Sequence, residues 1–277
     1  MELSIGFLKK IAIDIYDKIH PILGTKKAAE TFQRGVGGDI SMYIDILAEK
    51  VLIDLLKSKN IDLLLISEEI GEKFIGDKDK AIKNQQKFIV DPVDGSNNAI
   101  RGIPFCSVSI AYAIGNSLDH IIKAVIIDLT TKDIYWAEKN KGAYLNDKKI
   151  HVSERNISEN CFLELNLPLK RVVNELRNYS SIINKFYKIR VMGSTALTLC
   201  QIAKGSIDAF MDFIKNNRLV DVAAGILILK EAGGKIYSKE GKDLDETTLS
   251  IDTKFPFVAS NSELEPFLKE KLIKINL

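Results

Sequence analysis

The sequence contains few cysteines and almost no excess of charge of either sign. Its three cysteines, Cys106, Cys161 and Cys200, form no Cys-x-x-Cys pair within the 277 residues. This argues against a disulfide framework and against a cysteine-based zinc site, so we expect each to be a reduced core residue. The formal net charge is +2, from 39 basic and 37 acidic residues. Such a balance gives no electrostatic case for binding nucleic acid or an anionic membrane.

Long hydrophobic runs are also lacking. Apolar runs such as residues 61–66, which Asp62 interrupts, are far too short to span a membrane. The first residues include acidic side chains, unlike a secretory signal peptide. The apolar content is nevertheless 46%, which is enough for a sizeable core. These features predict a cytoplasmic protein that folds as one large domain or as two closely packed halves.

Helical and strand patterns alternate along the chain, which predicts a mixed, layered α/β fold. An exposed connection is expected over 71–87, and a glycine-rich loop over 35–39. We expect helices over 3–22, 41–58, 169–186, 196–204, 220–232 and 263–273, strands over 63–66, 88–90, 105–114, 123–129, 133–138, 162–167, 188–192, 207–213 and 257–260, and a hairpin over 142–150.

The most informative stretch is Asp91-Pro92-Val93-Asp94-Gly95-Ser96, which follows a buried-strand pattern. Proline restricts its own φ and biases the preceding residue toward extended geometry, so the strand is expected to end here. Gly95 permits a tight turn, and Ser96 is a residue type that caps helices. Two carboxylates beside a carbonyl suit Mg²⁺, and a helix N-terminus offers N–H groups to a phosphate. Taken alone, such a stretch is more often a simple turn.

Three other acidic segments are candidates for the same site. Ser67-Glu68-Glu69 ends a second buried-strand pattern with two acids. Asp221 lies in the first turn of a predicted helix, where the helix dipole alone favours an acid. Asp45 and Glu49 are four residues apart on one helical face, which ordinary exposed surface would explain.

Together these segments resemble the inositol monophosphatase and fructose-1,6-bisphosphatase superfamily of metal-dependent, lithium-sensitive sugar phosphatases. The order and spacing agree over nearly the whole chain. The glutamate motif is similar to residues 67–69, the Asp-Pro-(Ile/Leu/Val)-Asp-Gly-(Thr/Ser) motif to 91–96, the Gly-(Ser/Thr)-Ala-Ala segment to 193–196, and the Trp-Asp-x-Ala-(Ala/Gly)-Gly motif to 220–225. The resemblance implies a single domain that forms an α-β-α-β-α sandwich, with a metal-binding half at about 1–155 and a substrate half at about 156–277.

The resemblance also implies roles for individual residues. Two or three Mg²⁺ ions would lie between the acidic segments, and would activate water against a phosphate ester. The implied metal ligands are Glu68, Asp91, the Val93 carbonyl, Asp94, Asp221 and, from a mobile loop, Asp39. Glu68, Asp45 and Ser96 would act on the attacking water. The implied substrate contacts are Asp94, Gly95 and Ser96 for the phosphate, and Gly193, Ser194, Thr195 and Asp212 for the sugar. Arg190 and Arg218 are candidates for a second phosphate, although ordinary surface positions would explain both.

The implied activity is hydrolysis of fructose-1,6-bisphosphate, inositol-1-phosphate or both, by a cytoplasmic homodimer. The segments 37–39 and 213–218 look more like archaeal members, which often accept both substrates. Val220 stands where the family usually has Trp, and Asn97-Asn98 replaces Thr-Asn or Phe-Asn. One alternative is a nucleotide phosphatase acting on 3′-phosphoadenosine 5′-phosphate or NADP, although the Asp-Gly-Thr-Lys segment of the 3′-nucleotidase branch is missing. Another is a non-catalytic homologue, for which a lost carboxylate would be expected, and none is lost.

Overall fold

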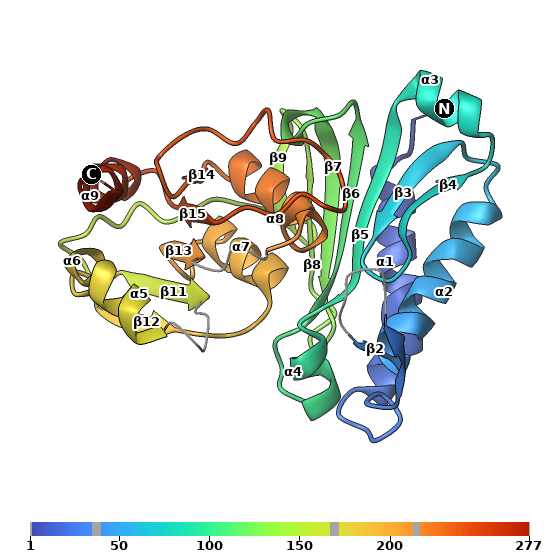
Figure 1. Ribbon diagram of the computed structural model, residues 1–277, viewed down its shortest axis with the longest axis horizontal. Coiled ribbons are helices and arrows are strands. Elements are labelled where there is room, and N and C mark those ends of the chain that lie inside the picture. Colours follow the sequence, from blue (N-terminus) through green and yellow to red (C-terminus); the bar gives the residue numbers. More distant parts are fainter. Residues whose placement is uncertain (1, 35–39, 167–171, 213–216, 277) are drawn as a thin grey trace.

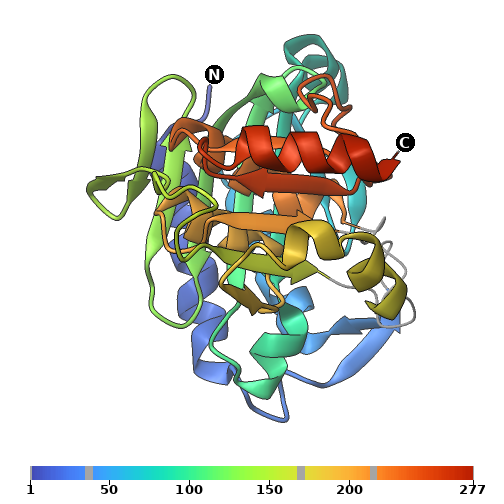
Figure 2. The same cartoon turned by 90° about the vertical axis from the view of Figure 1, so that its left-hand side faces the viewer.

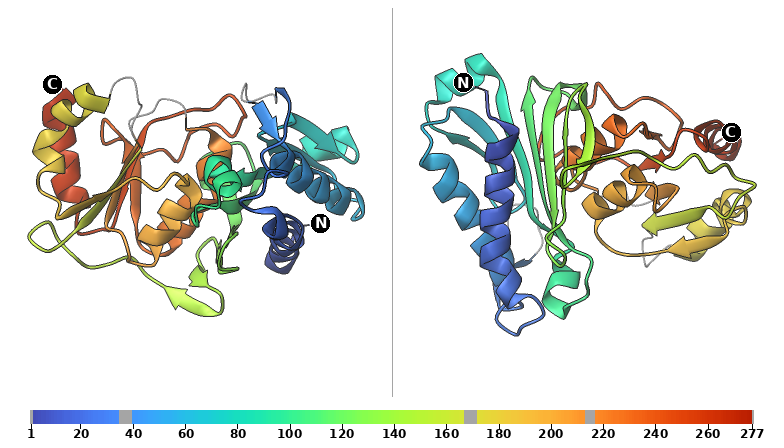
Figure 3. Two further views of the ribbon diagram at one scale, coloured as in Figure 1. Left: turned by 90° about the horizontal axis from the view of Figure 1, so that it is seen from below. Right: turned by 180° about the vertical axis from the view of Figure 1, so that it is seen from behind.

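Helices and sheets alternate in five layers in the computed structural model, which describes residues 2–34, 40–166, 172–212 and 217–276 (Figure 1). The layers run helix, sheet, helix, sheet, helix, which confirms the predicted α-β-α-β-α sandwich. Figure 2 views the molecule from the side of the C-terminal helix, and the right-hand view of Figure 3, from behind, shows the N-terminal helix in the outer layer on the opposite side.

The larger sheet has eight strands, all from the first 150 residues. β3 and β5 are parallel, and all other neighbouring strands are antiparallel. In order across the sheet, the strands are β10 (Lys148–Ile150), β9 (Gly142–Leu145), β8 (Ile134–Glu138), β7 (Ile121–Asp128), β6 (Ser107–Ile114), β5 (Gln86–Asp94), β3 (Leu63–Ser67) and β4 (Gly71–Ile75).

Two amphipathic helices, α1 (Ile5–Ile19) and α2 (Tyr43–Lys57), cover the outer face of this sheet. The 3.6-residue period of α1 puts Leu8, Ile11, Ala12, Ile15 and Ile19 on one face, and these side chains are buried in a core shared with the sheet. Ser4 caps α1 by accepting a hydrogen bond from the Phe7 N–H at 3.2 Å. A short two-stranded sheet, β1 (Thr31–Arg34) and β2 (Ile40–Met42), leads into α2.

The smaller sheet has five strands, all from the second half of the chain. Its strands, in order, are β12 (Lys188–Arg190), β11 (Phe162–Asn166), β13 (Ala209–Asp212), β15 (Phe257–Ser260) and β14 (Lys235–Ser238). The helices α5 (Val172–Asn178), α6 (Ser180–Ile183) and α9 (Glu265–Asn276) form the outer layer on this side (Figure 2).

The middle layer consists of α7 (Thr195–Ala203) and α8 (Leu219–Glu231), packed between the two sheets. Because α8 has a sheet on each side, its residues from Leu219 to Leu229 are all buried. Gly225 lets the helices approach closely, since a Cβ there would come within 2.6 Å of a Leu199 methyl carbon. The middle core contains side chains from both sheets. A core shared by both sheets is consistent with the predicted single domain.

Most predicted elements are present, but three expectations were wrong. The expected exposed connection over 71–87 contains β4 and a short helix, α3 (Lys78–Asn84). β4 was missed because it is an edge strand with two exposed charged residues, which hide its apolar alternation. β14 was also missed. The helix expected over 169–186 is broken into α5 and α6, and residues 167–171 lie outside the described part.

Two further findings bear on the composition. The three cysteines are free and buried, as predicted. Within the described ranges, none of the helices combines the length and the apolar character needed to cross a bilayer.

Candidate active site

The site is built around the end of β5, which runs further than its sequence pattern predicts. The strand continues past Val90 to Asp94, with an irregularity in its pairing with β6 between Asp91 and Asp94. A bulge of this kind tolerates Pro92, which has no N–H for the ladder, and it redirects the side chains around it. Asp91 is 2% exposed, and its Oδ1 accepts a hydrogen bond from the Val93 N–H at 3.0 Å. The bulge therefore presents Asp91 at the carboxyl end of β5.

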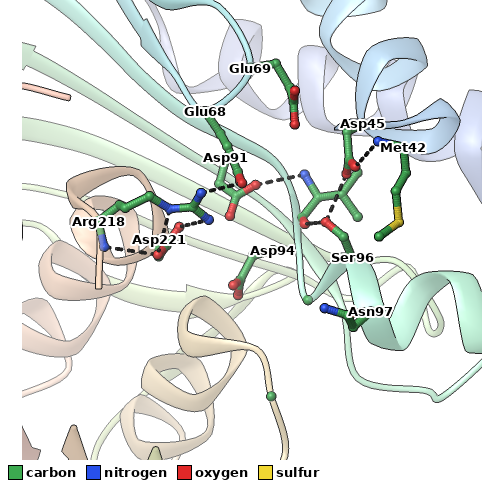
Figure 4. A pocket seen from close by; sticks show the side chains of 13 residues that line it. Met42, Asp45, Glu68, Glu69, Asp91, Asp94, Ser96, Asn97, Arg218 and Asp221 are labelled. Atoms are coloured by element: carbon green, nitrogen blue, oxygen red, sulfur yellow. Dashed lines mark hydrogen bonds and ion pairs between the residues drawn. The ribbon is translucent and has the colours of Figure 1, made fainter. Parts of the chain in front are cut away.

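Two other acids meet Asp91 from different layers. Glu68 follows β3, and because β3 and β5 are parallel, their carboxyl ends reach the same edge. Asp221 comes from the opposite side, in the first turn of α8. One carboxylate oxygen from each residue lies within 4.8 Å of the other two. Figure 4 shows Glu68, Asp91 and Asp221 grouped beside Arg218. An all-oxygen donor set of this kind fits a hard divalent cation such as Mg²⁺.

Burial and neighbouring acids disfavour the ionised forms of Asp91 and Glu68. Burial, followed by the like charges of Glu68 and Asp221, raises the pKa of Asp91 well above its ordinary value. Burial also raises the pKa of Glu68 to about 8, against the opposing effect of Arg218. Like charges this close are costly unless a cation lies between them. The electrostatics of the cluster therefore favour the binding of a cation.

Arg218 supplies one positive charge to this cluster. Its guanidinium donates to Glu68 through Nη1, and Nη2 lies 3.3 Å from Asp221 Oδ1. Burial alone would lower the pKa of Arg218, but Asp221 and Glu68 raise it. Asp221 also caps its own helix, accepting from the Arg218 N–H at 3.1 Å. The helix-dipole interpretation of Asp221 thus holds alongside its place in the cluster.

Asp45, Ser96 and Val93 form a hydrogen-bonded group on the other side of Asp91. The Ser96 Oγ lies 2.9 Å from Asp45 Oδ1 and 2.8 Å from the Val93 carbonyl oxygen. One hydroxyl proton therefore faces two acceptors. Asp45 also accepts from the Met42 N–H at 3.2 Å, at the start of α2. Burial raises the pKa of Asp45 to about 6, opposed by the Ser96 hydrogen bond.

Asp94 links the two halves of the molecule. Its Oδ2 accepts from the hydroxyl of Ser194 and, at 2.8 Å, from the N–H of Ala196. Both donors lie at the N-terminus of α7, which Asp94 therefore helps to cap. Burial and the nearby Asp221 raise the pKa of Asp94 to about 7, and these hydrogen bonds partly offset that rise.

A close backbone contact brings the residues of this link together. Gly95 has φ +86°, and a Cβ there would lie 3.2 Å from the Gly193 carbonyl oxygen and 3.3 Å from Ser194 Cβ. Only glycine combines that φ with such an approach. Asn98 braces the same contact, donating from Nδ2 to the Phe105 carbonyl at 2.8 Å and to the Met192 carbonyl at 2.7 Å. Asn98 thus holds the two halves together, a use that the sequence did not reveal.

Glu49 is a further residue whose place the sequence pattern missed. It is buried, although its position on α2 had suggested exposed surface. Its Oε1 accepts from the Ser67 hydroxyl at 2.7 Å and from the Ile70 N–H at 3.2 Å. These donors flank Glu68 and Glu69, so Glu49 fastens both ends of the acidic turn. Burial raises the pKa of Glu49 to about 7, despite the Ser67 hydrogen bond.

Most of the residues singled out from the sequence line one cleft of about 560 Å³ (Figure 4). Ser194 and Thr195 line an adjoining recess. Asp212 and Arg190 are not among the lining residues: Asp212 is buried and accepts from Asn217, and the Arg190 guanidinium lies over the Phe162 ring. Asp39 lies outside the described residues. The cleft is lined by Asp45, Glu68, Asp91, Val93, Asp94, Gly95, Ser96, Gly193, Arg218 and Asp221, and by Met42, Glu69 and Asn97, which had not been assigned a role.

Comparison with known proteins adds a family to this geometry. The model of the inositol monophosphatase family matches residues 5–275. The fructose-1,6-bisphosphatase/inositol-1-monophosphatase of Methanothermobacter thermautotrophicus is 34% identical over 277 residues, covering 96% of this chain and 95% of that protein. The bifunctional NADP phosphatase/NAD kinase of Methanococcus maripaludis is 32% identical, over 96% of this chain and 48% of that protein. The crystal structure of the extragenic suppressor protein suhB from Bartonella henselae has a TM-score of 0.82 at 30% identity, covering 97% of this chain and 98% of that one.

Proposed function

The chain belongs to the inositol monophosphatase family, and from that premise we propose that it is a Mg²⁺-dependent phosphomonoesterase acting on sugar or polyol phosphates. The observation that carries the proposal is the convergence of Glu68, Asp91 and Asp221, which come from three separate elements. Three acids from separate elements share one small space with the Arg218 guanidinium, and when they are ionised one guanidinium does not balance their charge, which favours a bound cation.

The proposed metal ligands are Glu68, Asp91 and Asp221, with Asp94 and the Val93 carbonyl oxygen beside them. Bound Mg²⁺ would lower the pKa of water and neutralise the charge of the phosphate ester. Asp45 and Ser96 would hold the attacking water: the water would give a proton to the Ser96 Oγ as the Ser96 hydroxyl gives its own proton to the Asp45 carboxylate. A pKa of about 6 for Asp45 suits that exchange near neutral pH.

The substrate contacts are proposed around this centre. Gly95 and Ser96 would hold the phosphate through backbone N–H groups. Arg218 lines the cleft, and its planar guanidinium suits a phosphate oxygen pair. The residues proposed to meet the sugar are Gly193, Ser194 and Thr195, which line the cleft or its recess. The family resemblance implies the same role for Asp212, a second-phosphate contact for Arg190 and a third-ion role for Asp39, although Asp212 and Arg190 do not line the cleft and Asp39 lies outside the described residues.

Other features of the proposal rest on the family alone. They are two or three bound ions, sensitivity to lithium, a homodimer and a cytoplasmic location. Each is separable from the chemistry, so none is needed for the test below.

The test is phosphate release from fructose-1,6-bisphosphate and inositol-1-phosphate, with Mg²⁺ and with EDTA. We expect release from at least one substrate, dependent on Mg²⁺ and abolished by EDTA. Asp91→Asn is the matched negative variant. Release that is unaffected by EDTA, or equal in Asp91→Asn, would contradict a metal-dependent mechanism at this site.

A second candidate is a nucleotide phosphatase. It is favoured by the similarity to the bifunctional NADP phosphatase/NAD kinase, whose matching part spans nearly all of this chain. NADP and 3′-phosphoadenosine 5′-phosphate therefore belong in the same assay. Release from either nucleotide alone would move the activity to that branch, and release from none of the four compounds would favour a non-catalytic role.

A further inference from the structure

A buried carboxylate on β11 has no part in the chemistry described so far. Glu164 is 2% exposed. Its Oε1 accepts from the Met192 N–H at 3.2 Å, and the nearby Thr198 hydroxyl directs its one proton to the Ser194 carbonyl oxygen at 2.7 Å. Its other oxygen, Oε2, is buried without a hydrogen-bond partner among the described residues. A buried carboxylate oxygen left without a donor is costly, and it needs an explanation.

Glu164 lines a recess of about 110 Å³ beside the cleft. The recess also contains Gly193, Ser194, Thr195 and Thr198, and Gly193 lines the main cleft as well. The two spaces therefore share a wall at the turn that packs against Gly95. A group attached to a phosphate ester in the cleft would reach the recess past Gly193.

The side chains around the recess limit what it can accept. The Ser194 hydroxyl is used by Asp94, and the Thr198 hydroxyl lies 2.7 Å from the Ser194 carbonyl oxygen. Among the buried side-chain polar atoms of the described residues that line the recess, Glu164 Oε2 lacks a hydrogen-bond partner, and it is an acceptor. An acceptor calls for a donor, and a carboxylate repels a second phosphate. The recess has room for at least a hydroxyl or hydroxymethyl group of a substrate.

We propose that Glu164 is a specificity-determining residue, which accepts a hydrogen bond from a hydroxyl of the substrate's sugar or polyol leaving group. The assignment rests on the proposed phosphatase activity and deepens it. It separates two functions within one site: the acidic cluster acts on the phosphate, and Glu164 distinguishes leaving groups that carry a donor from those that do not. Sites built to hydrogen-bond a substrate hydroxyl discriminate strongly against compounds that lack it.

The test compares Glu164→Gln with the unmodified protein on two kinds of substrate. Inositol-1-phosphate carries hydroxyls on its leaving group, and phenyl phosphate carries none. Glutamine keeps the shape and one carbonyl oxygen for Met192, but it lacks the carboxylate charge. A hydrogen bond to a charged group contributes about 1.5–3 kcal/mol, so kcat/KM for inositol-1-phosphate should fall roughly 10-fold to 100-fold. For phenyl phosphate, kcat/KM should change less than about 2-fold, since the acceptor has nothing to bind.

Tyr237→Phe is the control for removing a buried polar group. Tyr237 is on β14, at the far edge of the same sheet from β11 and β12. It should alter neither substrate's kcat/KM. Equal losses on both substrates in Glu164→Gln would assign Glu164 to holding the Met192–Gly193 turn, and no loss on either would leave it without a role; both outcomes overturn the proposal. If the unmodified protein hydrolyses fructose-1,6-bisphosphate but not inositol-1-phosphate, the bisphosphate replaces inositol-1-phosphate in this comparison. Release from none of the three compounds would overturn the proposed function itself, and the specificity assignment with it.

Discussion

Asp91 and Asp208 are both almost completely buried, but their surroundings are opposite. Asp91 is 2% exposed and Asp208 is 1% exposed. Asp208 accepts from the Ser153 hydroxyl at 2.6 Å, the Arg155 Nε at 2.8 Å and the Phe162 N–H at 2.7 Å. Asp91 accepts one backbone hydrogen bond and lies beside Glu68, Asp221 and Asp94, with the Arg218 guanidinium near the same cluster. Burial is common to both positions, so burial by itself does not distinguish a functional acid.

The number of hydrogen-bond donors around each acid distinguishes the structural Asp208 from the candidate site residue Asp91. Asp208 joins the 153–155 segment to the start of β11, and its charge is satisfied within the protein. The ionised form of Asp91 is disfavoured by its burial and by the neighbouring carboxyl groups unless a cation balances them. The donors around Asp208 stabilise the fold, whereas the acids around Asp91 favour the binding of a cation. Substitutions at the two positions should therefore have opposite consequences.

Asp91→Asn should have the largest effect on activity. It removes a ligand from the centre of the cluster, and we expect a loss of roughly 10³-fold or more in kcat/KM. The fold should persist, because the asparagine carbonyl can still accept from Val93 and a like charge has been removed. Kinetics together with circular dichroism would check both parts. Full activity in a correctly folded variant would remove Asp91 from the site.

Asp208→Asn should have the reverse effect. Breaking a buried, hydrogen-bonded ion pair costs about 3–5 kcal/mol, and the partial exposure of Arg155 places the expected loss near the lower end. The melting temperature should fall by roughly 10 °C. Activity per folded molecule should be unchanged at low temperature. A stable variant that has lost activity would contradict the contrast between the two acids.

Glu49→Gln should have an intermediate effect on activity. The variant weakens the hydrogen bonds to Ser67 and Ile70, so the turn that carries Glu68 is held less firmly in place. Substituting a residue that orients a metal ligand typically costs about 10-fold to 100-fold in metal affinity or activity. The Mg²⁺ concentration for half-maximal activity should rise, whereas an Asp54→Asn control on the same helix should leave it unchanged. An unaltered Mg²⁺ requirement in Glu49→Gln would show that the turn holds its shape without this residue.

The smallest effect concerns pH in the metal-free protein. The folded-state pKa values of Glu68 and Asp94, about 8 and about 7, lie above their unfolded values. Between the unfolded and folded values the folded state binds more protons, so this contribution to stability is lost as pH rises from about 5 to 8. Melting curves in EDTA should show this slope, and Asp91→Asn should flatten it. A steeper slope in the variant would contradict the repulsion assigned to the cluster.

Local signals explain why much of the site was predictable. Proline, glycine and serine around Asp91 and Asp94 mark a strand end and a turn, and strand patterns before Glu68 and Asp91 indicate acids at strand ends. The sequence could not reveal contacts between distant segments. The bond from Ser194 to Asp94 joins residues 100 positions apart. Glu49 repeats the helical spacing of an exposed face, and Glu164 occupies an ordinary strand position. Their burial depends on tertiary packing, which local periodicity does not record.

The most direct measurement is the melting temperature as a function of Mg²⁺ concentration for the unmodified protein, Asp91→Asn and Asp208→Asn. Binding to the folded state alone stabilises it by about 2.7 kcal/mol at 100 times the dissociation constant. We predict that Mg²⁺ raises the melting temperature of the unmodified protein and of Asp208→Asn by similar amounts, and that of Asp91→Asn hardly at all. Equal stabilisation of Asp91→Asn would contradict a cation site at this cluster.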